Sequence, residues 1–152
     1  MFRFSKKAIA IALAVLSLIS LCSCGSTHEE LAINNHAWEF NYVQNDDGKI
    51  IYCNADNRDL YEEAEVLEFW NSVKGGVFII ENEETQESFG FVYKIKEENP
   101  DTFLYDMAYT SDDGAKYGSA VVRKTIKEEG NNEYTLIINI EGYSIYFYES
   151  IK

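Results

Sequence analysis

Residues able to carry nucleophilic or metal chemistry are few in this chain, which has three cysteines and two histidines among 152 residues. A serine–histidine–acid triad would have to use His36, and no Gly-x-Ser-x-Gly sequence is present to expose a serine nucleophile. Zinc would have to use His36 and Cys53, and neither has further ligands at the spacing of a zinc site. Cys53 follows the apolar residues Ile50–Tyr52, so we predict a small buried side chain there rather than a reactive thiolate.

The 26 acidic residues could supply paired carboxylates for acid–base catalysis or oxygen ligands for calcium. Many lie in turn sequences such as Asn45–Gly48, where solvated side chains are expected. Residues Asn54–Asp59 begin like an oxygen-rich calcium loop, with Glu65 at the twelfth position. However, Asp59 stands where that loop needs glycine, and Arg58 places a cation at a ligand position. We therefore predict no catalytic residue, no metal and no cofactor.

The N-terminal residues have the organisation of a secretory signal. Arg3, Lys6 and Lys7 form a basic start, and Ala8–Leu21 follows as an apolar run interrupted only by two serines. This run is shorter than the about 20 residues that a membrane-spanning helix needs. Its length and position are typical of the apolar region of a cleaved signal peptide.

The sequence Leu21-Cys22-Ser23-Cys24-Gly25 closes this segment and resembles the lipobox of bacterial lipoproteins. Leu21 stands at the position three before the cleaved bond, and Ser23 is the small residue directly before it. The resemblance implies that residues 1–23 are removed as a lipoprotein signal peptide. Cys24 would then carry a thioether-linked diacylglycerol, and two acyl chains anchor a protein stably to a membrane. An uncleaved anchor, or ordinary secretion after Ser23, is the alternative.

The charge is distributed unevenly about Cys24. Three of the 13 basic residues precede Cys24 and none of the 26 acidic residues does, so the remainder has a formal charge of −16. Such a field repels phosphate backbones and anionic headgroups, which disfavours nucleic acid as a partner. We expect residues 24–32 to be the lipidated N-terminus and a polar spacer, and residues 33–152 to be one extracytoplasmic domain held at the cell membrane.

Beyond Ile33 the apolar residues recur with a period of two, and turn sequences separate the runs. The pattern predicts an all-β, antiparallel up-and-down meander of eight to nine strands, with one short helix near Tyr61. Closure into a barrel would remove the unpaired edges of such a meander. The predicted strands cover Trp38–Tyr42, Lys49–Asn54, a run through Leu67 and Phe69, Val77–Glu81, Phe89–Ile95, Phe103–Tyr109, Lys116–Ile126, Tyr134–Ile140 and Tyr143–Tyr148.

Over most of Asn35–Ser150 the chain is similar to the small lipocalin-like lipoproteins of bacteria. The similarity rests on a tryptophan in the first strand (Trp38-Glu39-Phe40-Asn41-Tyr42), an early Asp47-Gly48-Lys49 hairpin and closing strands that extend to Phe147. It implies a lipocalin-like β-barrel that could hold an apolar ligand in its mouth.

The tyrosines are the largest group of candidate binding residues, with 11 in the chain. Tyrosine offers a large contact area at a low entropic cost, although it is also common in packed strands. We expect a non-enzymatic, membrane-anchored domain that binds a small apolar ligand or an envelope protein. A structural or interaction lipoprotein with a filled barrel, and a cell-envelope enzyme using paired carboxylates, remain as alternatives. The candidate ligand-binding residues are Tyr105, Tyr109, Tyr143, Tyr146 and Tyr148.

Overall fold

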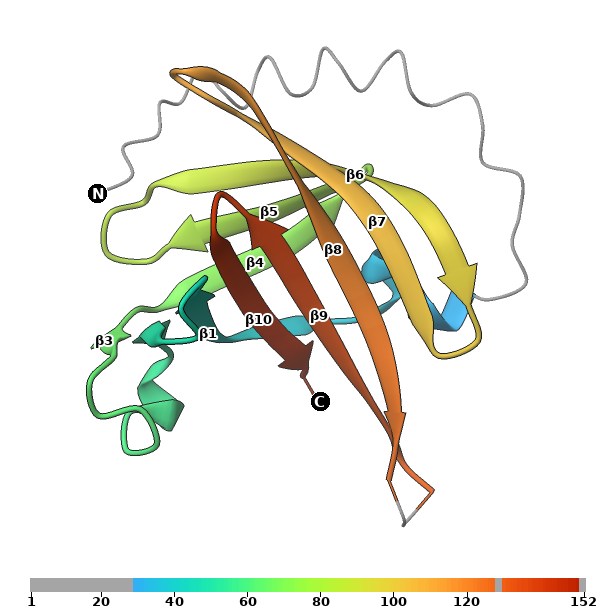
Figure 1. Ribbon diagram of the computed structural model, residues 1–152, viewed down its shortest axis with the longest axis horizontal. Coiled ribbons are helices and arrows are strands. Elements are labelled where there is room, and N and C mark those ends of the chain that lie inside the picture. The colour runs from blue at the N-terminus through green and yellow to red at the C-terminus, as the bar shows by residue number, and fades with distance from the viewer. Residues whose placement is uncertain (1–28, 128–129, 151–152) are drawn as a thin grey trace.

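The computed structural model describes residues 29–127 and 130–150, and their regular structure is almost entirely β-strand (Figure 1). The all-β class predicted from the period-two pattern is therefore confirmed. Ten strands form a single sheet, one more than the upper predicted number, because the run through Leu67 and Phe69 is divided between two strands. The strands are β1 (Trp38–Asn45), β2 (Ile50–Cys53), β3 (Glu65–Val66), β4 (Phe69–Lys74), β5 (Val77–Asn82), β6 (Ser88–Asn99), β7 (Thr102–Ser111), β8 (Gly114–Ile126), β9 (Asn132–Ile140) and β10 (Tyr143–Glu149).

Strands β4 to β10 form an antiparallel meander in which each strand pairs with the next along the chain. Strand β10 then pairs with β1, and β1 pairs with β2, so the two ends of the described chain lie side by side. The short strand β3 is the exception, because it runs parallel to β2 with Glu65 opposite Tyr52. The predicted meander is thus present, and the loop between β2 and β4 adds an edge to it.

The sheet curls like part of a barrel but remains open between its edge strands β3 and β4, which corrects the prediction of a closed barrel. The first half of β1 shows why. The Asn71 side chain on β4 donates a hydrogen bond of 2.7 Å to the Trp38 carbonyl, and the Asn54 side chain donates one of 2.7 Å to the Phe40 carbonyl. Side-chain amides therefore occupy the carbonyls that a neighbouring strand would use.

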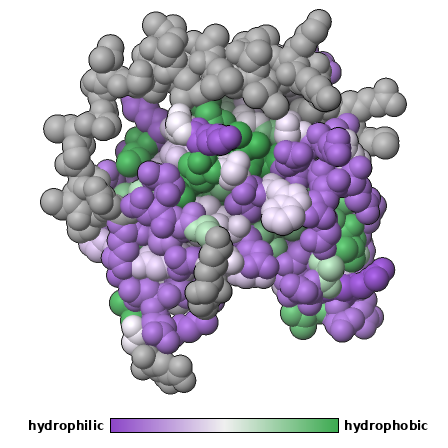
Figure 2. All heavy atoms as spheres, turned by 180° about the vertical axis from the view of Figure 1, so that it is seen from behind, coloured by the Kyte–Doolittle hydropathy of each residue, from purple (hydrophilic) through white to green (hydrophobic). Residues whose placement is uncertain are grey.

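The core is built from side chains that alternate along the strands, as the period-two pattern predicts. Aromatic rings interlock at its centre: the Phe147 ring lies 5.2 Å from the Phe78 ring and 6.0 Å from the Phe40 ring, both in edge-on geometry. Outside the core, the surface seen from behind is mostly hydrophilic, and its apolar side chains gather in small areas (Figure 2). The largest fully buried side chains are Tyr105, Phe78, Phe103, Phe147, Leu31, Ile33, Leu136, Ile138, Val122 and Cys53.

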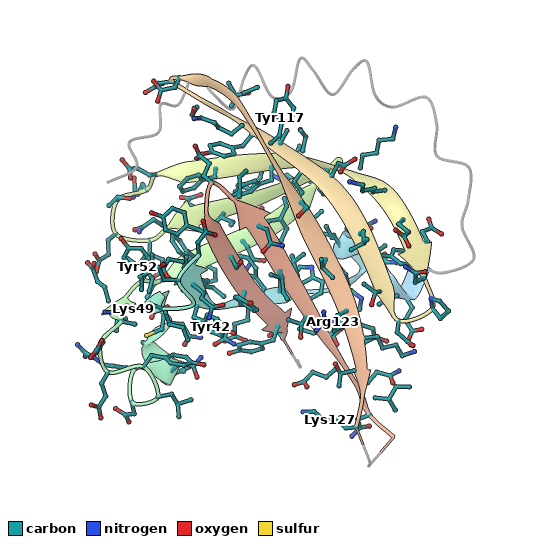
Figure 3. The ribbon with its side chains drawn as sticks, in the orientation of Figure 1. Tyr42, Lys49, Tyr52, Tyr117, Arg123 and Lys127 are labelled. Carbon is teal, nitrogen blue, oxygen red and sulfur yellow. The ribbon has the colours of Figure 1, made fainter. Side chains whose placement is uncertain are left out.

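Strand β1 departs from strict alternation. Its register against β10 shifts between Phe40 and Tyr42, which is the signature of a β-bulge. Trp38 and Phe40 are buried, and the next buried residue is Val43 rather than Tyr42. Tyr42, labelled in Figure 3, instead stacks on Tyr146 of the outer face of β10, with 4.3 Å between ring centroids. The bulge therefore reverses the inward orientation that the alternation Trp38–Phe40–Tyr42 predicts.

Two single-turn 3-10 helices, η1 (Glu29–Leu31) and η2 (Ile33–Asn35), close one end of the curled sheet. Leu31 and Ile33 are 1% and 0% exposed, and we call this pair the N-terminal plug. The Trp38 indole N–H donates to the Ile33 carbonyl at 2.8 Å, and the Tyr105 hydroxyl donates to the Leu31 carbonyl at 3.1 Å. In Figure 1 the plug segment lies near the β6–β7 hairpin, on the side of the molecule away from the β9–β10 hairpin.

Polar contacts fasten the plug to the sheet. The Glu30 carboxylate accepts hydrogen bonds from the Lys124 ammonium, at 2.9 and 3.1 Å, and from the Tyr134 hydroxyl. His36 lies 2.7 Å from the Glu149 carboxylate through Nδ1 and 2.5 Å from the Glu30 carbonyl through Nε2. Residues 30 and 36 are therefore tied to strands β8, β9 and β10, which fixes the plug in place.

The short helix predicted near Tyr61 is a single 3-10 turn, η3 (Ala55–Asn57), followed by hydrogen-bonded turns that extend to Ala64. Asn54 begins this turn, because its side-chain oxygen accepts the Asn57 N–H at 3.0 Å. The Tyr61 N–H donates to the Asn57 carbonyl at 3.2 Å, so the chain makes a further helical turn without continuing as a helix.

Candidate functional site

An apolar cavity of about 470 Å³ lies at the end of the curled sheet opposite the N-terminal plug. Strands β1 and β2, the β5–β6 hairpin and the β9–β10 hairpin surround it. Of the 17 described residues that line it, twelve are aliphatic or aromatic, and the other five are polar or acidic. The lining residues are Val43, Ile51, Tyr52, Glu65, Leu67, Phe69, Ile80, Asn82, Thr85, Glu87, Phe89, Phe91, Tyr109, Ile140, Glu141, Tyr143 and Ile145.

The apolar wall follows from the register of neighbouring strands. Ile80 on β5 lies opposite Phe89 on β6, so both side chains point to the same face of the sheet. The rings of Phe89 and Phe91 are nearly parallel, with 6.3 Å between centroids, and Phe91 meets the Tyr109 ring edge-on at 5.5 Å. Phe69 on β4, the strand next to β5, extends this wall to the opening between the edge strands. This arrangement is a concave, preformed apolar surface.

Glu141, in the β9–β10 hairpin, accepts polar contacts from two neighbouring side chains. The Tyr109 hydroxyl donates a hydrogen bond to Glu141, and the Lys116 ammonium lies 3.0 Å from the other oxygen of the same carboxylate. The Tyr109 and Lys116 hydrogen bonds hold the pKa of Glu141 below its ordinary value. Burial and the hydrogen bond to Glu141 raise the pKa of Tyr109, so this hydroxyl stays neutral and acts as a donor. Glu141 is therefore an ionised, occupied acceptor at the edge of the cavity.

The hairpin that carries Glu141 has a tight two-residue turn. Glu141 and Gly142 have φ values of 48° and 81°, the left-handed geometry of the turns that join twisted strands. A Cβ atom on Gly142 would stand 2.8 Å from an Asp46 carboxylate oxygen, so the β1–β2 loop lies directly against this turn. The Glu-Gly pair thereby places a carboxylate at the cavity while the two hairpins pack together.

The five candidate tyrosines separate into three groups. Tyr109 and Tyr143 line the apolar cavity. Tyr105 is 1% exposed at the plugged end, where it donates to Leu31. Tyr146 and Tyr148 alternate with the buried Phe147 and lie on the outer face of β10, and the Tyr146 hydroxyl donates to Gln44 at 3.3 Å. The structure thus brings two of the five together at the cavity.

Several cavity residues were not among the sequence candidates. Tyr52 on β2 lines the cavity beside the β1–β2 hairpin (Figure 3). Ile80, Phe89 and Phe91 belong to predicted strands, so the period-two pattern could have identified them as inward-facing residues. Glu65 carried no such signal, because it belongs to a two-residue strand whose parallel pairing with β2 depends on a long-range contact.

A second hollow of about 630 Å³ follows the seam between β1 and β4, and we call it the seam groove. Although it is larger, it is mainly polar, and its amides from Asn54 and Asn71 already bond to β1 carbonyls. Trp70 stands at its edge with 66% of its surface exposed. A small-molecule site is typically apolar with few polar groups, so the apolar cavity fits that description better.

Cys53 and Asp106 are not among the residues that line the apolar cavity. Cys53 is fully buried, and burial raises the pKa of its thiol, as expected for a structural cysteine. Asp106 pairs with Lys96 at 3.2 Å on the exposed face. Within residues 29–127 and 130–150, no group of three His, Cys, Asp or Glu side chains could hold a metal ion.

The predicted lipidation residue, Cys24, and the predicted signal peptide lie outside the described residues. In the described part of the chain, no helix has both the length and the apolar character needed to cross a membrane. No family model matches the chain, and no curated protein or solved structure matches it either.

Proposed function

We propose that this protein is a membrane-anchored extracytoplasmic lipoprotein whose lipocalin-like domain binds a small apolar ligand without catalysis. The apolar cavity is the observation that carries the proposal. Its volume of about 470 Å³ lies within the range of about 300–1,000 Å³ that is usual for small-molecule sites. Its wall is aromatic and aliphatic, and its polar residues stand at the edge, where they could orient a ligand.

The curled sheet supports a lipocalin-like reading of the fold, although its edges stay apart. The meander from β4 to β10 returns to β1 in the manner of an up-and-down barrel, with one end occupied by the plug and the other concave. The opening between β3 and β4 leaves Leu67 and Phe69 beside the cavity. A ligand could therefore be covered by residues on both sides of this opening.

Ligand binding is tested by native mass spectrometry of the mature protein purified from cells, with and without added apolar compounds. Ile51→Trp should abolish the bound species, because the larger ring would fill the cavity that Ile51 lines. Ile126→Trp is the matched control, since Ile126 is 68% exposed near the β8–β9 hairpin and away from the cavity. A protein that is empty in every preparation, with Ile51→Trp indistinguishable from Ile126→Trp, would refute the binding function.

The anchor is tested separately. Cys24→Ala should abolish labelling by a radioactive fatty acid and partitioning into a detergent phase, because the acylated thiol is lost. Cys22→Ala should leave both unchanged, because Cys22 would be removed with the signal peptide. Retained labelling of the Cys24→Ala variant would overturn the assignment of this residue.

An interaction lipoprotein without a ligand is the second candidate. The observation that favours it is the exposed Trp70 on the edge strand β4, beside the seam groove. Edge strands can accept a strand from another chain, and exposed tryptophans are common at interfaces. An empty cavity combined with loss of an envelope complex in a Trp70→Ala variant, observed by cross-linking in cells, would favour this function over ligand binding.

A further inference from the structure

The charged residues that line the apolar cavity are all acidic. They are Glu65, Glu87 and Glu141, and no lysine, arginine or histidine is among the described residues that line it. The cavity therefore combines an apolar wall with a negative edge. An apolar ligand alone would not use these carboxylates, and it would gain nothing from their position.

The three carboxylates differ in how far their charge is compensated. Glu141 is paired with Lys116 and accepts the Tyr109 hydroxyl. Among the described residues, the Glu87 carboxylate has only a long contact of 3.4 Å with the Thr85 hydroxyl, and Glu65 has no ion pair.

Lys49, which directly precedes β2, does not supply the missing charge. Lys49, labelled in Figure 3, is not among the residues that line the cavity, and its ammonium is 3.1 Å from the Glu63 carboxylate. Two negative charges at the cavity thus lack a basic partner within the described chain.

Aromatic rings add to the same preference. Tyr52 and Tyr143 line the cavity together with the acids, and the face of a tyrosine ring attracts a cation. A carboxylate-bearing ligand would meet repulsion from Glu65 and Glu87 as well as from the charge of −16 on residues 24–152. The site therefore favours a cation and disfavours an anion at the same position.

We propose that the ligand of the apolar cavity is an amphiphile whose apolar body enters the cavity and whose protonated amino group lies among Glu65, Glu87 and the tyrosine rings. This inference rests on the proposed binding function, since it specifies the chemical class of the ligand of that cavity. It distinguishes the protein from a carrier of fatty acids, which would present a carboxylate to the same edge.

The test compares three ligands with the same apolar body: octylamine, octanol and octanoate. Equilibrium dialysis measures their binding to the mature lipidated protein in vesicles of neutral phosphatidylcholine, with empty vesicles as the blank. Octylamine should bind about tenfold more tightly than octanol, and octanoate should bind more weakly than both. Tenfold in Kd corresponds to about 1.4 kcal/mol, a magnitude suited to partly exposed charges. The preference should shrink at high salt because exposed charges are screened.

The variant Glu65→Gln/Glu87→Gln should bind octylamine and octanol equally. Glu97→Gln/Glu98→Gln is the control, because it also removes two negative charges, but near the β6–β7 hairpin at the plugged end. It should keep the preference for the amine. Equal binding of amine and alcohol to the unmodified protein would overturn this inference and leave the binding function intact. Binding of none of the three ligands would count against both.

Discussion

The seam between β1 and β4 offers a test of how this sheet is held together. Two hydrogen bonds of the same length, 2.7 Å, join an asparagine amide to a β1 carbonyl. They differ in their surroundings. Asn54 is 6% exposed and its bond to the Phe40 carbonyl is buried, whereas Asn71 is half-buried and its bond to the Trp38 carbonyl is only partly buried. Replacing each asparagine by alanine should therefore have unequal effects on stability.

The expected magnitudes follow from what each substitution leaves behind. Asn54→Ala leaves the Phe40 carbonyl buried without a partner, at a cost of about 1–3 kcal/mol. It also removes the side-chain oxygen that caps η3, at a cost of about 1 kcal/mol, so the total is about 2–4 kcal/mol. Asn71→Ala should cost only about 0.5–1.5 kcal/mol, because water in the polar seam groove can replace the lost amide.

Urea unfolding followed by tryptophan fluorescence measures both free energies of unfolding, since Trp38 and Trp70 report on the seam. Asn54→Ser separates the two contributions, because a serine hydroxyl can cap η3 but is too short to reach the Phe40 carbonyl. Asn54→Ser should recover about 1 kcal/mol of the loss in Asn54→Ala. Equal destabilisation by Asn54→Ala and Asn71→Ala, or complete recovery in Asn54→Ser, would refute the reasoning.

Two further predictions concern the core and the plug. Phe147→Ala should lower the free energy of unfolding by about 3–5 kcal/mol, because it removes a fully buried ring packed on two others, and a loss below 1 kcal/mol in urea unfolding would contradict this. Two hydrogen bonds hold the pKa of Glu30 below its ordinary value of 4.5; the one from Tyr134 has the larger effect and the one from Lys124 the smaller. The stability that ionised Glu30 contributes is therefore present above pH 4.5 and is lost as the pH falls through the lower folded-state pKa, so Glu30→Gln should flatten the acid side of the profile of melting temperature against pH. An unchanged acid side would show that Glu30 does not fasten the plug.

Most strands and turns of this sheet could be predicted because their signals are local. Phe103–Tyr109 alternates perfectly between buried and less buried residues, and Glu141-Gly142 forms the tight hairpin turn that its composition indicates. The β1 bulge could not be predicted, because one extra residue reverses Tyr42 without changing the apolar pattern around it. The division of β3 from β4 depends on pairing across the fold, which no local period encodes.

The candidate site was harder to predict than the fold. Alternation alone places Tyr143 on the inner face and Tyr146 on the outer face of β10, but it does not say which end of the sheet is filled. That depends on Leu31 and Ile33, which occupy the end that contains Tyr105. Glu65 and Glu87 reach the cavity from separate strand ends, and only the folded sheet brings them to one opening.

The position of the N-terminal plug has a consequence for the orientation of an anchored molecule. Glu29, where η1 begins, is five residues after Cys24, and five extended residues span at most about 18 Å. A lipid on Cys24 would therefore hold the plugged end next to the bilayer, because the Glu30 contacts attach η1 to the sheet. The apolar cavity would then open away from the membrane, so that ligand would enter and leave through the aqueous compartment rather than directly from the lipid leaflet.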